Sequence, residues 1–253
     1  MKKYFNKSLV FLLLLIMLTN CNSDTEVTNI GPTTGQGGSL ARFTIVDNYL
    51  YVVDNQSLKT FNIANKNNTV AGPVVQIEQG IETIFPYQNK LFIGARNGMH
   101  IFDISQPGTP GKISTYRHIT SCDPVVVNGN TAYVTLRSGN TCGGGINVLD
   151  VIDISDPGSP DLLQSYDMTG PYGLGIADTL LFVTEGALGM KVYDASDPHQ
   201  LVTLDTAVDV QGFDVIAVKE QNLIMVIGND GFAQYDYSDP FDLKLLSIIN
   251  VQN

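Results

Sequence analysis

The hexapeptide Phe102-Asp103-Ile104-Ser105-Gln106-Pro107 decides the fold, because it recurs along the chain. The later copies are Ile152-Asp153-Ile154-Ser155-Asp156-Pro157, Tyr193-Asp194-Ala195-Ser196-Asp197-Pro198 and Tyr235-Asp236-Tyr237-Ser238-Asp239-Pro240, and a degenerate first copy is Phe61-Asn62-Ile63-Ala64-Asn65-Lys66. The successive anchor positions Asn62, Asp103, Asp153, Asp194 and Asp236 lie 41, 50, 41 and 42 residues apart. A repeat of this length that is rich in β-forming residues is typical of the blades of a β-propeller.

Each repeat is predicted to contain four short strands. The clearest strand is a β-branched and aromatic run between turn residues, at 49–53, 90–93, 131–135, 180–183 and 223–227. We therefore predict an all-β fold, a five-bladed β-propeller of four-stranded antiparallel blades, at about 41–77, 81–117, 121–168, 170–207 and 211–250. Gly173 and Gly175 on an innermost strand fit the crowded axis of a small propeller. A β-sandwich is the alternative, but it does not explain the self-similarity.

The first twenty residues are predicted to form a lipoprotein signal peptide. Lys2, Lys3 and Lys7 precede an apolar run at 9–18, which is too short to span a bilayer comfortably. The sequence Leu18-Thr19-Asn20-Cys21 follows and resembles a bacterial lipobox, although Asn20 departs from the usual small residue. We therefore predict a lipid on Cys21 that anchors the protein to a membrane. The alternative is an ordinary signal peptide with an incidental cysteine.

Residues 21–39 are predicted to form a flexible tether ahead of a propeller at 40–253, because they are polar and rich in Gly and Thr. The acidic start at 22–26 loosely resembles the stretch that sends some lipoproteins of the Bacteroidetes group to the cell surface. The alternative is a solvated tail. The expected location is a bacterial cell envelope at the outer membrane, facing either the periplasm or the outside.

Composition excludes several classes of partner. The chain has a net charge of −11 and no basic run, which argues against nucleic acid. The three histidines are scattered and no Cys-x-x-Cys occurs, so we predict no metal site and no cofactor. The absence of Trp weakens any hypothesis of a Trp-lined sugar platform.

The Ser-Asp-Pro-x-x-Pro unit after a Val/Ile-Asp strand resembles the LVIVD-repeat family of bacterial propeller proteins, over residues from about 41 to 250. The segments 122–127, 133–137 and 171–176 are similar to lipoproteins of that family. The resemblance implies an extracytoplasmic propeller and supplies no catalytic site. The first repeat departs from the pattern at Asn62 and at Asn65-Lys66.

The repeated aspartates are interpreted as structural. Each closes a strand, the following Pro ends the ladder, and the Asp or Ser side chains can cap backbone N–H groups in the turn. The alternative is one ligand contact per blade, for example a ring of cation ligands.

The third repeat carries an insert at 138–146. The chain has three cysteines, so only Cys122 and Cys142 remain once Cys21 is lipidated. In an oxidising compartment we expect these two to pair with each other. Chain tracing through a propeller places both in loops on one face of the same blade. We therefore predict a Cys122–Cys142 disulfide that secures the insert.

The same face is the candidate binding surface, because loops at one end of a rigid β-scaffold commonly bind ligands. Its candidate residues are Glu82, Arg96, Asp123, Arg137, Tyr172, Glu185, Phe213 and Asp214. The alternative is a set of ordinary solvated loop tips. We predict a non-catalytic, monomeric binding or scaffold module for a protein or glycan partner. The alternative function is a glycan-active enzyme that uses the carboxylates Glu82, Asp123, Glu185 and Asp214.

Overall fold

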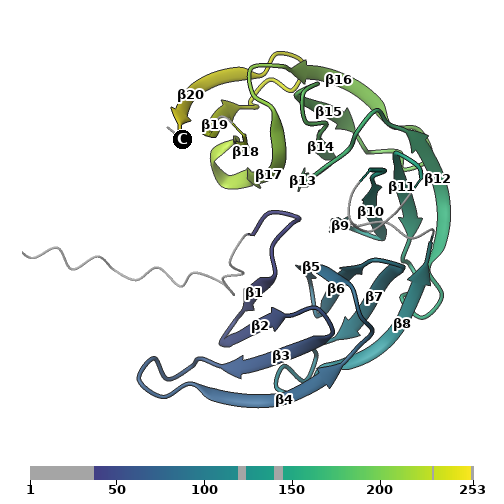
Figure 1. The fold of residues 1–253 in the computed structure, drawn as a ribbon, viewed down its shortest axis with the longest axis vertical. Coiled ribbons are helices and arrows are strands. Elements are labelled where there is room, and N and C mark those ends of the chain that lie inside the picture. Colours follow the sequence, from purple (N-terminus) through teal and green to yellow (C-terminus); the bar gives the residue numbers. More distant parts are fainter. Residues whose placement is uncertain (1–36, 119–123, 140–144, 230, 252–253) are drawn as a thin grey trace, which may run out of the picture. The chain divides into compact units, whose positions relative to one another are not determined.

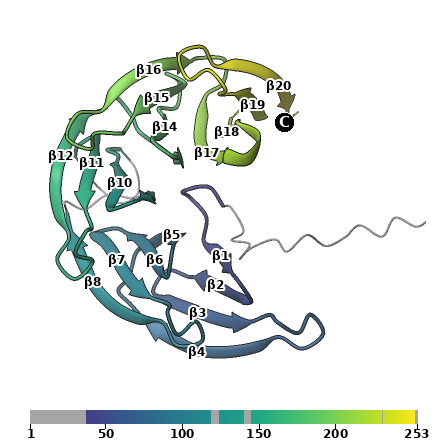
Figure 2. The same cartoon turned by 180° about the vertical axis from the view of Figure 1, so that it is seen from behind.

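The computed structural model describes residues 37–118, 124–139, 145–229 and 231–251. Over these residues the predicted all-β fold is confirmed: five antiparallel sheets of four strands follow one another along the chain (Figures 1 and 2). The only helix in the described ranges is the single-turn 3₁₀ helix η2 (Lys219–Gln221). No described helix has the length and hydropathy of a membrane span.

Each sheet is one blade, and its strands pair in chain order. Blade 1 contains β1 (Phe43–Val46), β2 (Tyr49–Val53), β3 (Ser57–Asn62) and β4 (Val70–Gln76). Blade 2 contains β5 (Ile81–Tyr87), β6 (Lys90–Ala95), β7 (Gly98–Asp103) and β8 (Gly111–Arg117). Blade 3 contains β9 (Val125–Asn128), β10 (Thr131–Leu136), β11 (Val148–Asp153) and β12 (Asp161–Asp167). Blade 4 contains β13 (Leu174–Ala177), β14 (Leu180–Thr184), β15 (Met190–Asp194) and β16 (Val202–Ala207). Blade 5 contains β17 (Gly212–Val218), β18 (Leu223–Gly228), β19 (Gly231–Asp236) and β20 (Lys244–Asn250).

The first strand of every blade is innermost and the fourth is outermost (Figure 1). Burial follows this order: β9 to β11 are almost wholly buried, whereas β12 is mostly exposed. The middle strands pack on a neighbouring blade with both faces, and their sequences are therefore continuous runs of apolar residues.

The hydrophobic core lies between the blades and is divided into four clusters. They join blades 1 and 2, blades 2 and 3, blades 3 and 4, and blades 4 and 5. Within the described part of the chain, no such cluster joins blade 5 to blade 1. Among the described residues, Phe43 of blade 1 is 60% exposed and Ile227 of blade 5 is 43% exposed.

The structural interpretation of the repeated aspartates is confirmed. The Ser196 N–H donates to Asp194 Oδ1 at 2.9 Å, and the same bond to the anchor residue forms in the other four repeats. It forms even where the anchor is Asn62, so the degenerate first copy makes the same Asx turn. A register shift between the third and fourth strands also recurs in every blade.

The prediction for the axial glycines also holds. A Cβ on Gly173 would lie 2.6 Å from Cα of Asp214 and 2.7 Å from the backbone oxygen of Phe213. A Cβ on Gly175 would meet the Val215 oxygen at 3.2 Å. The innermost strands of blades 4 and 5 therefore approach so closely that a side chain at Gly173 cannot be accommodated.

Candidate functional site

The predicted binding residues occupy equivalent positions at the starts of the innermost strands and just after the second strands. Glu82 and Asp214 lie in β5 and β17, and Tyr172 lies just before β13. Arg137 follows β10 and Glu185 follows β14. The repeat geometry therefore places these residues at one end of the blades, which we call the entry end.

Three of the candidates form one continuous contact across three blades. The guanidinium carbon of Arg137 lies 3.9 Å from the ring centroid of Tyr172. The Tyr172 and Phe213 rings lie 5.2 Å apart between centroids, tilted by 47°. The Thr135 hydroxyl donates to the Tyr172 carbonyl at 2.6 Å, which fixes the backbone that carries the ring. All three residues are partly exposed, so this Arg137–Tyr172–Phe213 stack lies at the surface of the entry end.

The three candidate carboxylates that the structure describes, Glu82, Glu185 and Asp214, make structural contacts. Glu82 pairs with Arg42, with Nη2 and Oε2 3.4 Å apart. Glu185 is 3% exposed, accepts the Thr169 N–H at 2.8 Å through Oε1, and forms an ion pair with Lys191 through Oε2. These two contacts hold the buried side chain of Glu185 in place.

Asp214 holds a segment that the sequence assigns to the tether. The Ser39 hydroxyl donates to Asp214 Oδ1 at 3.0 Å and accepts the Leu174 N–H at 2.7 Å. The Leu40 N–H points to Asp214 Oδ2 at 3.4 Å. Burial raises the pKa of Asp214, and the hydrogen bonds from Ser39 and Val215 partly offset that rise. Gly38 and Ser39, the last two residues of the predicted tether, are buried.

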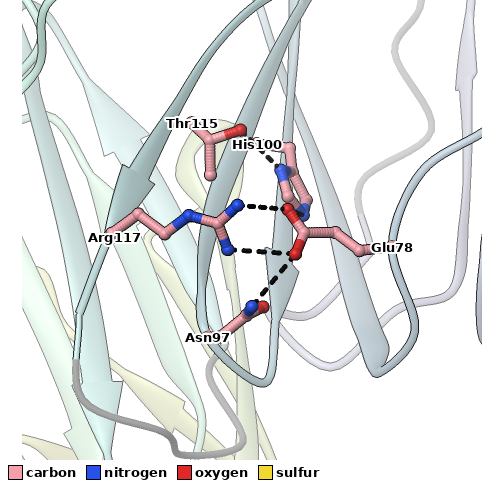
Figure 3. Close-up of polar contacts among 5 residues, drawn as sticks. All are labelled: Glu78, Asn97, His100, Thr115 and Arg117. Atoms are coloured by element: carbon pink, nitrogen blue, oxygen red, sulfur yellow. Dashed lines mark hydrogen bonds and ion pairs between the residues drawn. The ribbon is translucent and has the colours of Figure 1, made fainter.

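A second polar cluster, which the sequence does not predict, joins blades 1 and 2 (Figure 3). Glu78 accepts two bonds from Arg117, at 2.9 and 3.0 Å, and one from Asn97 at 3.0 Å. His100 is fully buried beside it, with Nδ1 2.9 Å from Thr115 Oγ1 and Nε2 3.8 Å from Glu78 Oε1. The Arg117 bonds lower the pKa of Glu78 to about 2, and burial lowers the pKa of His100 to about 4. The cluster thus fixes the connection between the two blades.

A cavity of about 300 Å³ lies among the innermost strands of blades 2 to 5. Its walls are 85–87, 126–128, 174–178 and 215–217, with Gly37, Lys219 and Glu220. The charged residues Asp178, Lys219 and Glu220 follow the innermost strands, so they lie at the end opposite to the entry end. Sequence reasoning missed them because they sit in short turns with no motif.

Inter-blade bonds line the same turns. The Gly129 N–H donates to the Tyr87 hydroxyl at 2.7 Å, and the Asn128 side chain donates to the Asp178 carbonyl at 2.5 Å. Lys219 forms an ion pair with Asp178. Blades 2 to 5 are therefore connected in sequence around the cavity.

Arg96 directly follows β6 and so also lies at the entry end, and the other remaining candidates lie outside the described ranges. Arg96 is exposed in the turn between β6 and β7, and its N–H donates to the Gly80 carbonyl at 2.8 Å. Asp123, Cys21, Cys122 and Cys142 lie outside the described residues, so the lipid anchor and the disulfide stay predictions. Among the residues that the structure describes, no group of three or more His, Cys, Asp or Glu side chains could hold a metal ion.

The family comparison agrees with the repeat pattern. The LVIVD repeat matches residues 87–118 and 121–168, which lie in blades 2 and 3. The chain therefore contains LVIVD repeats in these two blades. No curated protein sequence matches it.

Solved structures have a similar fold at low sequence identity. A functionally unknown protein from Desulfotomaculum acetoxidans is 11% identical with a TM-score of 0.67, and the match covers 87% of this chain and 70% of that one. The periplasmic gluconolactonase PpgL of Pseudomonas aeruginosa is 15% identical with a TM-score of 0.61, over 81% and 68%. AztD of Citrobacter koseri is 11% identical with a TM-score of 0.59, over 85% and 61%. This chain therefore spans between 61% and 70% of the length of these structures, and the likeness shows the fold alone.

Proposed function

We propose that this LVIVD propeller is a non-catalytic binding module of the bacterial cell envelope that holds a protein partner at its entry end. The observation that carries the proposal is the Arg137–Tyr172–Phe213 stack, which three successive blades build. Tyrosine and arginine dominate the energetics of protein interfaces because they combine rigid apolar area with directional polar groups. A glycan partner receives less support, because the chain has no Trp for a sugar platform.

The contacts of three of the four candidate carboxylates favour binding over catalysis. A glycoside hydrolase needs two carboxyl groups that face the same sugar with opposite tasks. Here Glu185 and Asp214 are buried and accept hydrogen bonds from Thr169 and Ser39, and Glu82 pairs with Arg42. These contacts support a role in holding loops and segments at the entry end.

The test is capture of partners from envelope extract by the full chain in mild detergent, in parallel with a glycan array. The variant Arg137→Ala/Tyr172→Ala removes the stack. The matched control Lys66→Ala/Phe241→Ala also removes one cation and one aromatic ring, from exposed turns between the third and fourth strands.

A protein captured by the wild type and the control, and lost by the stack variant, supports the proposal. If a glycan is bound by the wild type and the control but not by the stack variant, the assigned site is correct and the partner is a glycan rather than a protein. Capture that the stack variant retains overturns the assignment to the entry end.

A further inference from the structure

The cavity among the innermost strands is a second candidate site, separate from the entry end. It has a volume of about 300 Å³, and four successive blades contribute to its walls. Most of its lining side chains are apolar, as at Val127, Ile176 and Ile216, and at Gly175 the backbone of β13 lines it directly. A cavity of this size, with apolar walls and a few polar groups, is typical of a site for a small molecule.

The charged groups of the cavity are gathered at one end, which we call the exit end, where each innermost strand turns into the second strand. Asp178 lies in this turn of blade 4, and Lys219 and Glu220 lie in the turn of blade 5. Lys219 forms an ion pair with Asp178, whereas within the described part of the chain no ion pair involves Glu220. The described charges at this end of the cavity therefore comprise two carboxylates and one ammonium group.

The two carboxylates act on the same place between blades 4 and 5. Burial raises the pKa of the Tyr237 hydroxyl, and the charges of Asp178 and Glu220 add to that rise. Both carboxylates therefore contribute a negative potential at the exit end of the cavity, although Lys219 neutralises part of it.

The wider exit end is acidic as well. The third strands of blades 2 to 5 end there on the anchor residues Asp103, Asp153, Asp194 and Asp236. Hydrogen bonds from the serine two positions later lower the pKa of each anchor carboxyl, so all four are charged at neutral pH. The four arginines of the chain, at 42, 96, 117 and 137, lie at the entry end instead. This distribution raises the local concentration of cations at the exit end.

The opposite end of the cavity is apolar and held in place. Leu174 and Val215 line it together with Gly37. The adjoining Ser39 is bonded to the Leu174 N–H and to Asp214, which fixes this segment against blades 4 and 5. A molecule in the cavity would therefore meet apolar side chains toward the entry end and charges toward the exit end.

We propose that this cavity binds a small organic cation, an amine whose apolar body is about as large as a phenyl ring. The apolar body lies against Ile176 and Ile216, and the ammonium group lies at the exit end beside Glu220. Charge complementarity decides the class of ligand, because an organic anion of the same shape would face the carboxylates of the whole exit end. The inference does not depend on the proposed function, which concerns the entry end.

The first test is isothermal titration calorimetry of the full chain in mild detergent with three probes of similar shape. Phenethylamine is the cation, phenethyl alcohol the neutral probe and hydrocinnamate the anion. The cation should bind most tightly and the anion most weakly. This preference should decrease as the salt concentration rises from about 50 to about 500 mM, because salt screens exposed charges. Equal affinity for the three probes, or no binding of phenethylamine, overturns the proposal.

Two matched variants separate a site from a general attraction of cations. Glu220→Gln should weaken the binding of phenethylamine about two- to fivefold, as expected for a partly exposed ion pair, and leave phenethyl alcohol unaffected. Asp242→Asn removes the same charge from an exposed turn of the exit end that does not line the cavity, and it should change neither affinity. Because both residues are exposed, both variants should fold. Equal weakening by the two variants contradicts the proposal.

A second measurement locates the bound probe. In methyl NMR spectra of the isoleucine-labelled full chain, phenethylamine should shift the signals of Ile176 and Ile216, which Ile176→Val and Ile216→Val assign. The signal of Ile113 on the outermost strand β8 should stay unchanged. If phenethylamine leaves the signals of Ile176 and Ile216 in place, the cavity does not accept the probe and the proposal is wrong.

Discussion

The guanidinium of Arg137 lies over the ring of Tyr172, 3.9 Å from guanidinium carbon to ring centroid, although the two residues belong to different blades. The contact is therefore both part of the proposed binding surface and a link between blades 3 and 4. Since the pair is partly exposed, we expect a contribution of about 0.5–1 kcal/mol to the free energy of unfolding.

A double-mutant cycle measures that link. Arg137→Ala, Tyr172→Leu and the double variant are unfolded in urea, and the coupling energy should be about 0.5–1 kcal/mol. The control cycle combines Arg137→Ala with Tyr87→Leu, whose hydroxyl bonds in the turns at the opposite end. Equal coupling in both cycles would show that the stack contributes nothing specific.

Ser39→Ala should destabilise the propeller, although residue 39 precedes the first strand. The substitution leaves the buried Leu174 N–H without an acceptor and removes a donor from Asp214. The expected cost is about 1–3 kcal/mol in the free energy of unfolding. The exposed Ser159→Ala is the matched control and should change stability by less than about 0.5 kcal/mol. A Ser39→Ala protein as stable as its control would mean that the segment does not hold the blades.

His100 should make the protein sensitive to mild acid. Its pKa is lowered by burial to about 4, with Lys112 and Arg117 acting in the same sense and Glu78 opposing them. The unfolded chain, with a histidine pKa of about 6.5, binds the proton more readily than the folded chain. Stability is therefore lost as the pH falls from about 6.5 toward 4.

The check is the unfolding free energy of wild type and His100→Gln across that pH window. The difference between the two proteins should shrink or reverse as the pH falls, because only the wild type must keep this imidazole neutral. The exposed His199→Gln should follow the wild-type curve. Parallel curves for wild type and His100→Gln would contradict the prediction.

Gly189→Ala should be strongly destabilising. Gly189 has a φ of +85°, and an added Cβ would lie 2.0 Å from the Ala207 carbonyl oxygen. The backbone conformation alone should cost about 1–3 kcal/mol, and the clash adds to it. Gly111→Ala is the control, since a Cβ there meets nothing within 4 Å. The midpoint temperatures of thermal unfolding of the two variants test this prediction, and Gly189→Ala should have the lower midpoint. Similar midpoints would show that the turn before β15 accommodates the added methyl group.

The repeat pattern predicts the blades well because residues close together in the sequence specify their turns and strands. The Asx turn at Asp194 needs only residues two positions apart, and the close approach at Gly173 appears in the sequence as a glycine on an inner strand. For the same reason the five blades and their strand order follow from the recurrence of one hexapeptide.

The site is predicted less well because its contacts join residues far apart in the chain. Ser39 and Asp214 are 175 positions apart, and nothing in either local sequence marks their bond. Glu185 is a charged residue in a predicted loop, which suggests a binding role. In the structure, its contacts with Lys191 and the Thr169 amide hold it in the interior. The Glu78–His100 cluster cannot be predicted from the sequence, because the scattered histidines do not form a motif with a recognisable spacing.

The Asx turns also bear on how the chain folds. Each turn closes a bond between an anchor residue and the amide two positions later, so it can form before any contact with another blade. A hairpin that starts on such a turn pays little loop-closure entropy. Five equivalent nucleation points are thus distributed along the polypeptide, and folding can begin at any of them and spread to its neighbours, as in other repeat proteins.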